Sequence, residues 1–461
     1  MKVEYTKLAS LSSSIVTIDR TTGVHYGDIV SLHFQDQSLI GQVIGLKEDS
    51  AQVQVFGDTS GMTLTNASVV FEGKPFTLAL NREILGRVFD GAGRPIDGGG
   101  EIYSDRAYNI NGSAMNPVSR QYPSDFIQTG ISAIDGLMTI IRGQKLPIFS
   151  SAGLDHDRIA AQIIRQSEIR HTQDDFVFVF GAIGVQKDEA DFFTQTFRSA
   201  GVQDKVVTFM NLANDPVMER ILVPKCALTA ADYLAFEEGM HVLVILSDLT
   251  SYAETLRELS SLREEVPSRK GYPGYLYSDL AAIYERAGIL RDRRGSITLL
   301  PILTMPNDDI THPIPDLTGY ITEGQIVLSR SMNQKGIYPP IDVLPSLSRL
   351  MKDSIGADFT REDHATLSAQ LYSAYARVED VRNLAQVIGE EDLSEEDQQV
   401  LAFGDAFEQQ FLRQDFDEKR TIEQTLDLGW RLLALLPESL LTQVSPEMKE
   451  KYLPKRASTE A

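Results

Sequence analysis

Residues 148–163 read Ile-Phe-Ser-Ser-Ala-Gly-Leu-Asp-His-Asp-Arg-Ile-Ala-Ala-Gln-Ile. An apolar run, a short turn with glycine and a helix-like repeat follow one another, which predicts a strand, a loop and a helix. This order is typical of the phosphate-binding loop of α/β nucleotide-binding domains. Such a loop needs the pattern Gly-x-x-x-x-Gly-Lys-Thr/Ser, because glycines let backbone N–H groups surround the phosphates, the lysine neutralises them and the hydroxyl ligates magnesium.

The positions that define such a loop hold other residues here. In an ungapped comparison, the loop positions are occupied by Ser150, Gly153, Asp155, His156 and Asp157. Two carboxylates beside a histidine that is mostly neutral at pH 7 repel a triphosphate. The sequence therefore predicts a degenerate P-loop. An ordinary strand, loop and helix without that ancestry is the alternative.

The composition is that of an acidic globular chain. Of 461 residues, 42% are hydrophobic and 23% are charged, which is enough apolar material for several cores. Lys and Arg number 43 against 65 Asp and Glu, so the net charge is −22. This charge disfavours binding to nucleic acid or to an anionic membrane surface, and it favours protein partners.

Disulfides and membrane-spanning segments are not expected. The single cysteine, Cys226, cannot form an intrachain disulfide and is predicted to fill the core. The most apolar runs, residues 176–180 and 242–246, are as long as strands and far shorter than the roughly 20 residues that a bilayer helix needs. We therefore expect no direct membrane insertion.

Residues 1–76 have the periodicity of strands. Apolar residues alternate with polar ones in short bursts, as at Val30, Leu32 and Phe34, and turn-forming Gly and Asp separate the bursts, as at residues 57–61. Short strands at this spacing predict a small antiparallel β-barrel. Some such barrels bind oligonucleotides, but the basic and aromatic residues required for that are not gathered here. We expect a structural collar.

Residues 77–350 change to an α/β pattern, beginning with a turn-rich connector at residues 86–100. Continuous apolar runs then alternate with helical stretches, which predicts a parallel sheet covered on both faces. The runs are residues 146–149, 176–180, 206–210, 242–246 and 297–303. Asp248 follows the run at residues 242–246, at a position where hydrolases hold magnesium through water. Capping of the next helix is the preferred interpretation of Asp248.

Residues 351–461 have helical periodicity. Apolar residues between positions 367 and 388 lie on one face at steps of three and four. Candidate N-caps at Thr360, Ser394 and Thr421 are each followed three residues later by a carboxylate or an amide. Core packing of a helical bundle explains the apolar stripe of the second helix, formed by Val400, Phe403, Phe407 and Phe411.

Four motifs in order carry a resemblance to a known family. The motifs are Thr-Gly-Ile-Ser-Ala-Ile-Asp-Gly-Leu at residues 129–137, Gly-Tyr-Pro-Gly-Tyr-Leu at 271–276, Tyr-Glu-Arg-Ala-Gly at 284–288 and Pro-Pro-Ile-Asp-Val-Leu-Pro-Ser-Leu-Ser-Arg at 339–349. Over essentially its whole length the chain resembles the rotary ATPase subunits. The Phe-Ser-x-x-Gly-Leu pattern at residues 149–154 makes it most similar to the non-catalytic B subunits of V-type (archaeal/vacuolar type) ATPases. The resemblance implies an N-terminal β-barrel, a central P-loop-type nucleotide-binding domain with a parallel sheet and a C-terminal helical bundle.

A second motif of the catalytic members of this family is also missing. In those members the strand after the P-loop helix is followed by Gly-x-Gly-Glu, and the Glu orients the attacking water. Here residues 180–184 read Phe-Gly-Ala-Ile-Gly and are followed by Val185, which accepts no proton. Because the phosphate grip and the water-activating group are both missing, the chain alone is expected to be inactive.

Arg349 directly follows the Ser-x-Ser of the last motif. In the resembling family, this arginine reaches into the catalytic site of the adjacent A subunit, where a guanidinium stabilises the charge that develops in phosphoryl transfer. The resemblance thus assigns Arg349 as an arginine finger in trans, with Ser346 and Ser348 as further nucleotide-binding residues. A surface arginine paired with a carboxylate is the alternative.

The resemblance also implies substrates and partners. ATP or ADP with Mg lies at the interface with a catalytic A subunit, none is bound by this chain alone, and A and B subunits alternate in a hexameric ring. A central rotor shaft and a peripheral stalk complete a cytoplasmic head that is peripheral to the membrane. The complex couples ATP synthesis or hydrolysis to hydrogen-ion or sodium transport.

An acidic run precedes the second C-terminal helix. The resemblance assigns contact with the rotor to Asp392, Leu393, Ser394, Glu395, Glu396 and Asp397. A solvated charged face is the alternative, because helix capping alone accounts for Ser394 and Asp397.

Two other functions stay open. An autonomous hexameric ATPase of the same superfamily, such as a secretion-system ATPase or an RNA translocase, needs the missing Lys and Glu. The translocase also needs a basic channel, which a net charge of −22 disfavours. A pure scaffold without nucleotide function has no need of Arg349 at an interface. ATPase assays of the chain alone and mixed with its A partner distinguish these functions.

Overall fold

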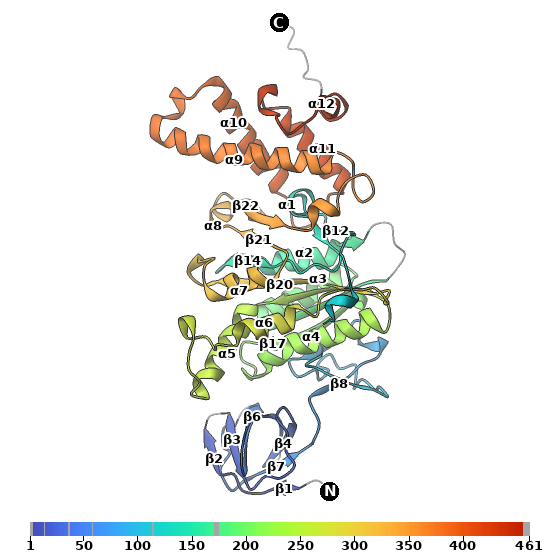
Figure 1. Ribbon diagram of the computed structural model, residues 1–461, viewed down its shortest axis with the longest axis vertical. Helices are drawn as coiled ribbons and strands as arrows, with labels where there is room; N and C mark the ends of the chain where they lie inside the picture. Colours follow the sequence, from blue (N-terminus) through green and yellow to red (C-terminus); the bar gives the residue numbers. More distant parts are fainter. Residues whose placement is uncertain are drawn as a thin grey trace.

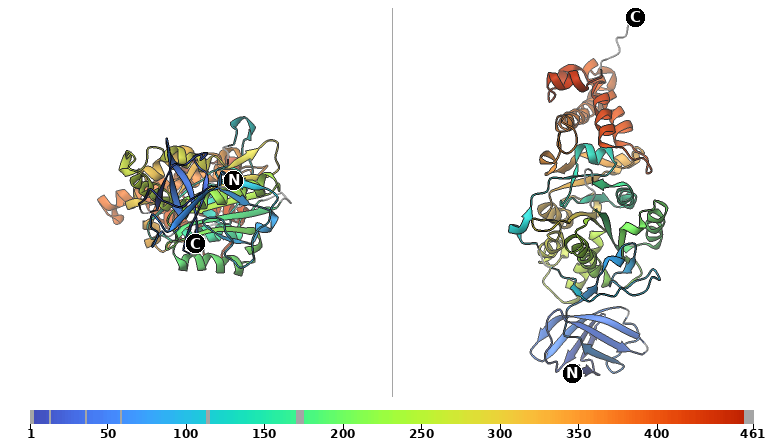
Figure 2. Two further views of the ribbon diagram at one scale, coloured as in Figure 1. Left: turned by 90° about the horizontal axis from the view of Figure 1, so that it is seen from below. Right: turned by 90° about the vertical axis from the view of Figure 1, so that its right-hand side faces the viewer.

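The computed structural model describes residues 3–12, 14–35, 37–57, 59–112, 115–169 and 175–454. The molecule is elongated, with a curled β-sheet at one end, an α/β layer in the middle and a group of helices at the other end (Figure 1). The right-hand view of Figure 2 shows the same three parts from the side. This architecture is the one that the sequence predicts. The domain limits of 1–76, 77–350 and 351–461 stay predictions.

The N-terminal part is a seven-stranded antiparallel sheet in the order β1-β7-β4-β5-β6-β3-β2. Successive side chains of a strand face opposite sides, so Val30, Leu32 and Phe34 of β4 are buried while His33 is exposed. The predicted alternation is confirmed. The strands are β1 (Glu4–Tyr5), β2 (Ser10–Ser12), β3 (Ile15–Asp19), β4 (Ile29–Phe34), β5 (Gln37–Lys47), β6 (Ser50–Phe56) and β7 (Ala67–Phe71).

A ten-stranded sheet forms the middle layer, and its main order is β22-β21-β14-β20-β18-β16-β17-β9. Neighbours from β21 to β9 are parallel, whereas β22 is antiparallel to β21. Each predicted apolar run overlaps one of these strands. They are β9 (Val88–Asp90), β11 (Arg120–Gln121), β14 (Ile148–Ser151), β16 (Phe176–Val185), β17 (Val206–Leu212), β18 (His241–Ser247), β19 (Gly288–Leu290), β20 (Ser296–Met305), β21 (Gly324–Leu328) and β22 (Ile341–Ser348).

The predicted connector at residues 86–100 is partly a strand. β9 lies within it and pairs in parallel with β17. Phe89 is buried, and its ring stacks on that of Phe209 with 5.1 Å between centroids. The glycines around β9 hide so short a strand in the sequence, because its pairing depends on a distant partner.

Helices cover both faces of the sheet. Phe180 of β16 contacts the ring of Phe193 on α3, whereas the adjacent Val179 belongs to the core under α4, which also buries Cys226 as predicted. This accounts for the continuous apolar run of a strand that is buried on both faces. The helices are α1 (Ser132–Leu137), α2 (His156–Gln166), α3 (Lys187–Ser199), α4 (Glu219–Phe236), α5 (Leu249–Leu262), α6 (Leu276–Tyr284), α7 (Pro313–Ile321) and α8 (Arg330–Gln334).

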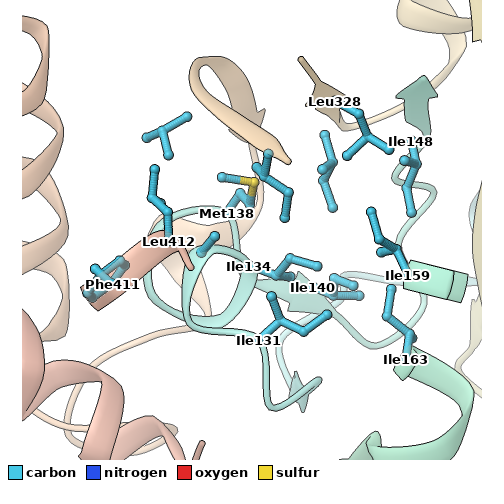
Figure 3. Close-up of a cluster of buried hydrophobic side chains, with 14 of the residues drawn as sticks. Ile131, Ile134, Met138, Ile140, Ile148, Ile159, Ile163, Leu328, Phe411 and Leu412 are labelled. Atoms are coloured by element: carbon cyan, nitrogen blue, oxygen red, sulfur yellow. The ribbon is translucent and has the colours of Figure 1, made fainter. Parts of the chain in front are cut away.

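The C-terminal helices share a core with one face of the sheet. Figure 3 shows Phe411 and Leu412 beside Ile134 of α1, in a cluster that continues to Ile148 and Ile163. The helices are α9 (His364–Ile388), α10 (Glu395–Ala406), a π-helical turn (Phe407–Leu412), α11 (Ile422–Leu433) and α12 (Pro446–Tyr452). In the described part of the chain, none of the helices has the length and apolarity to cross a membrane.

Two of the three predicted N-caps are confirmed. The hydroxyls of Ser394 and Thr421 each accept a hydrogen bond from the backbone N–H three residues later, at 3.1 and 3.3 Å. The cap predicted at Thr360 is wrong, because α9 begins at His364. The carboxylate of Asp363, which the sequence assigned to that cap, is bound by other side chains.

Candidate functional site

The loop between β14 and α2 has the position of a P-loop but not its contacts. Ser150 is buried, and its hydroxyl donates to the carbonyl of Ser151 at 3.1 Å. Gly153 has φ of +78°, and nothing lies within 4 Å of where its Cβ would be, so this glycine serves a left-handed turn. Asp155 makes no side-chain cap to α2 and lies 3.5 Å from the guanidinium of Arg158.

The start of α2 is electrostatically unsuited to phosphate. Asp157 is largely buried, and its carboxylate accepts a hydrogen bond from Ser247 at 3.3 Å. Burial raises the pKa of Asp157 above its ordinary value; His156 opposes this, and the carboxylates of Glu189 and Asp248 raise it further. An anion that entered here would meet carboxylates in place of the lysine of a competent loop.

Two further positions at this end of the strands are engaged within the fold. The Asp248 carboxylate accepts hydrogen bonds from the backbone N–H groups of Thr250 and Thr304, at 2.8 and 3.1 Å. It caps α5, as the preferred interpretation predicts. Val185 ends β16 and is buried in the core. Within the described ranges, no group of three or more His, Cys, Asp or Glu is arranged to hold a metal ion.

Arg330 of α8 lies against the same loop, and the sequence did not single it out. Its guanidinium donates to the carbonyl of Ala152 at 2.9 Å and pairs with Asp308 at 3.0 Å. This cation therefore holds the loop backbone and is already neutralised. The pairing of β14 with β21 brings α8 to the loop, so no local pattern in the sequence marks Arg330.

Arg349 and the loop lie at opposite ends of the strands of the sheet. β22 runs antiparallel to β21, and Ser348 pairs with Gly324 at the start of β21, so Arg349 is at the amino ends of the parallel strands. The loop leaves the carboxyl end of β14, which is parallel to β21. The five residues of β21 span about 16 Å at about 3.3 Å per residue. One phosphate cannot contact both sites of the same chain.

The guanidinium of Arg349 is exposed and bonded on one side only. Its Nη1 donates to the carbonyl of Thr322 at 3.0 Å, and its backbone N–H donates to the carbonyl of Glu323 at 2.8 Å. No carboxylate among the described residues forms an ion pair with it, unlike Arg330 and Arg361. Among the described residues, Arg349 is therefore not the carboxylate-paired arginine of the alternative interpretation, and its contact with nucleotide stays a prediction.

The two serines before Arg349 are engaged within the chain. The Ser346 hydroxyl accepts a hydrogen bond from the N–H of Val327 at 2.9 Å and donates to the carbonyl of Asp342. The Ser348 hydroxyl accepts one from Gln144 Nε2 at 2.9 Å. Both serines fix β22 against its neighbours. A direct contact between them and nucleotide stays a prediction.

Sequence reasoning missed the side chains beneath Arg349. Gln144 and Lys145 are buried directly before β14, and both contact Glu323. Two buried polar residues in a row before an apolar strand are a usable signal, because such groups require partners. Their partner lies on a distant segment, so the sequence alone does not identify it.

The acidic run lies at the tip between α9 and α10 (Figure 1). Arg377 of α9 lies 3.0 Å from Glu396 and 3.6 Å from Asp397, which neutralises part of the run. Asp392 and Glu395 are the exposed carboxylates. Of the other predicted contact residues, Ser394 caps α10 and Leu393 is buried in the core.

Comparisons with known proteins agree with this architecture. The beta-barrel domain of the ATP synthase alpha/beta family matches residues 11–73, the nucleotide-binding domain of that family matches 130–348, and the C-terminal domain of V and A type ATP synthase matches 353–453. A solved structure described as a unique ATP synthase subunit NeqB from Nanoarcheaum equitans is 37% identical, with a TM-score of 0.72, and covers 91% of this chain and 100% of that chain. The class defined by fold and site is that of the alpha/beta-type ATP synthase subunits.

Closer relatives share nearly the whole chain. The V-type ATP synthase beta chain of Halothermothrix orenii is 59% identical over 450 residues, 97% of each chain. V-type ATP synthase beta chain 2 of Clostridium tetani is 57% identical over 455 residues, 98% of this chain and 99% of that one. The chain belongs to the family of V-type ATP synthase beta chains. The resemblance carried by the four motifs is thereby confirmed.

Proposed function

We propose that this chain is the non-catalytic B subunit of a V-type ATP synthase and that it lends Arg349 to a catalytic site on a neighbouring subunit. One observation carries the proposal. Arg349 is exposed, pairs with no carboxylate among the described residues, and lies at the sheet edge opposite the chain's own loop. A guanidinium that has no carboxylate partner among the described residues suits phosphoryl transfer, in which negative charge spreads over the equatorial oxygens of the transferred group.

The degenerate loop supports a division of labour between subunits. Asp155, His156 and Asp157 replace the residues that grip phosphate, so the substrate, ATP or ADP with Mg, is held by the partner's loop. Head-to-tail interfaces in a ring bring different edges of neighbouring subunits together. Arg349 therefore contacts the nucleotide, while Ser346 and Ser348 hold the strand that carries it.

The proposed assembly is a hexamer in which catalytic A subunits alternate with this chain. A central rotor shaft contacts the acidic tip at residues 392–397, and a peripheral stalk holds the head still. The head is cytoplasmic and peripheral to the membrane, and it couples ATP synthesis or hydrolysis to hydrogen-ion or sodium transport. The similarity to V-type ATP synthase beta chains supports this assembly.

ATP turnover of the reconstituted A/B head tests the role of Arg349. We expect no turnover from this chain alone and turnover from the mixture with its A partner. In the mixture, Arg349→Ala should lower kcat by roughly 10³-fold or more while the hexamer still elutes intact, because an arginine finger contributes about 10³- to 10⁵-fold. Arg349→Lys should restore only part of kcat, since lysine keeps the charge but lacks the planar fork.

Arg431→Ala is the matched control, because Arg431 is an exposed arginine on α11 and belongs to no proposed site. We expect this variant to turn over ATP like the unmodified mixture. Turnover by the isolated chain at the rate of the mixture would contradict the proposal. So would an assembled Arg349→Ala complex that retains most of its activity.

A further inference from the structure

We infer that Gln144 and Lys145 are positioning residues for Arg349. They hold the turn at Thr322 and Glu323, whose two carbonyl oxygens in turn hold the arginine. This inference rests on the proposed function of Arg349 and extends it to side chains that touch neither nucleotide nor partner.

Among the described residues, the turn accepts the only hydrogen bonds that Arg349 donates. The guanidinium bonds to the carbonyl of Thr322 and the backbone N–H to that of Glu323, so these two oxygens decide where the cation lies. Gly324 follows, with φ of +143°, and a Cβ there would lie 2.2 Å from the carbonyl of Leu347. β21 and β22 therefore approach too closely at this point for any side chain. Small displacements of the turn are transmitted to Arg349.

Lys145 clamps the turn through Glu323. Its backbone N–H donates to Oε2 of that carboxylate at 2.8 Å, its Nζ lies 3.0 Å from Oε1, and its own carbonyl accepts the N–H of Glu323 at 3.1 Å. The Lys145 side chain is only 6% exposed. A pair in such a site is weakly screened by salt, and removing one partner leaves the other charge uncompensated.

Further charges extend this clamp into the domain. Lys145 Nζ also lies 3.1 Å from Glu285, and Glu285 pairs with Arg120 at 2.6 Å. Positive and negative side chains thus alternate along one chain of ion pairs that ends at the turn, in the order Arg120, Glu285, Lys145 and Glu323. The arrangement holds the ammonium of Lys145 between two carboxylates.

Gln144 fixes the other side of the turn. It is fully buried, and its Nε2 donates to the Ser348 hydroxyl at 2.9 Å and to the Glu323 carbonyl at 3.3 Å. One amide thus bridges the residue before Arg349 and the carbonyl that accepts the Arg349 N–H. The Oε1 of Gln144 is itself held by the N–H of Ile141 at 3.0 Å.

The placement of the guanidinium matters because its contribution depends on geometry. A displacement of about 1 Å in a group that acts on the transition state can cost roughly 10²-fold in rate. Arg349 is exposed and has no carboxylate partner among the described residues to orient it. The buried side chains under the turn supply that orientation before nucleotide arrives.

Lys145→Met in the reconstituted A/B head tests this inference. We expect kcat to fall roughly 10- to 100-fold with KM for ATP nearly unchanged, because the partner's loop still binds the phosphates. Lys145→Arg, which keeps the charge at the carboxylates, should recover most of kcat. The control is Lys419→Met, which removes a lysine paired with Glu168 at 2.8 Å, away from the turn. It should leave kcat unchanged.

A second variant covers the case in which Lys145→Met does not assemble. Glu323→Gln keeps the shape of the side chain and the hydrogen bond from the Lys145 N–H, but removes the charge that the ammonium binds. The same pattern is expected, a lowered kcat with little change in KM.

The double variant separates this inference from the role of Arg349 itself. In an Arg349→Ala background, Lys145→Met should lower turnover no further, because Lys145 acts through the arginine. Loss of activity in Arg349→Ala together with an unchanged kcat in Lys145→Met would overturn the positioning role and leave the finger intact. An equal further loss in the double variant would also overturn it. An active Arg349→Ala would instead refute the proposed function.

Discussion

At the residue scale, Asp363 explains why the predicted cap at Thr360 does not form and how α9 is joined to α11. Its carboxylate accepts hydrogen bonds from Arg361 at 2.6 and 2.9 Å and from the indole N–H of Trp430. Burial raises the pKa of Asp363, but these two partners outweigh burial, so the pKa lies below its ordinary value. The side chain ties the start of α9 to α11, which leaves it unavailable as a helix cap.

Asp363→Asn should lower the free energy of unfolding by about 3 kcal/mol, the lower end for a buried ion pair that loses one partner. Because the folded pKa is the lower one, this stabilisation is complete above the unfolded pKa of about 4 and is lost as the pH falls through the folded pKa. Urea unfolding followed by fluorescence measures it, since Trp430 is the only tryptophan.

Asp427→Asn is the matched control for Asp363→Asn. Asp427 pairs with the same Arg361 at 2.6 Å, but its side chain is 64% exposed. Exposed pairs contribute at most about 1 kcal/mol. Equal losses in the two variants would contradict the assignment of the stabilisation to the buried carboxylate.

At the element scale, what the sequence could predict depends on how local the signal is. Ser394 and Thr421 cap α10 and α11 through bonds to N–H groups three residues away, so a short pattern suffices. The short strand β9 was missed because its pairing with β17 is distant. Lys145 was missed for the same reason, because its clamp on Glu323 exists only once β21 pairs with β14.

Thr421→Ala should destabilise the helical part by about 1 kcal/mol, the usual effect of removing an N-cap hydroxyl. Here the cap is reciprocal, since Gln424 also bonds to the Thr421 N–H at 2.9 Å. Trp430 lies on α11 itself, so the fluorescence midpoint in urea reports the loss. Thr421→Ser keeps the hydroxyl and should match the unmodified chain. If the Ala variant matched it too, the cap would contribute nothing.

At the scale of the whole molecule, periodicity predicted the order of barrel, sheet and helices, and a motif singled out Arg349, whose role stays a prediction. Among the described residues its guanidinium has no carboxylate partner, which could not be predicted because it depends on every segment that surrounds the end of β22. The same holds for the acidic tip. Its sequence gives the charges, but only the fold pairs Glu396 and Asp397 with Arg377 and leaves Asp392 and Glu395 exposed.

Reversing the two exposed charges tests the tip as a rotor contact. Asp392→Lys with Glu395→Lys should weaken binding of the assembled head to the purified rotor shaft about tenfold, and less at high salt, because exposed charges are screened. Affinity measured at low and at physiological salt checks this. Glu447→Lys with Glu450→Lys on α12 is the control, since it reverses two exposed charges away from the tip (Figure 1). Equal affinities for both pairs would favour a merely solvated face.

Arg349 and the degenerate loop lie at opposite ends of the parallel strands, and this has a consequence for the stoichiometry of a ring. Suppose that copies of this polypeptide alone formed a closed ring. Every interface would then place Arg349 of one copy against the degenerate loop of the next, and no interface would hydrolyse ATP. If a second polypeptide with a phosphate-binding loop alternated with this one, every second interface would become active and the others would stay inactive. The number of active interfaces would then equal the number of copies of this chain.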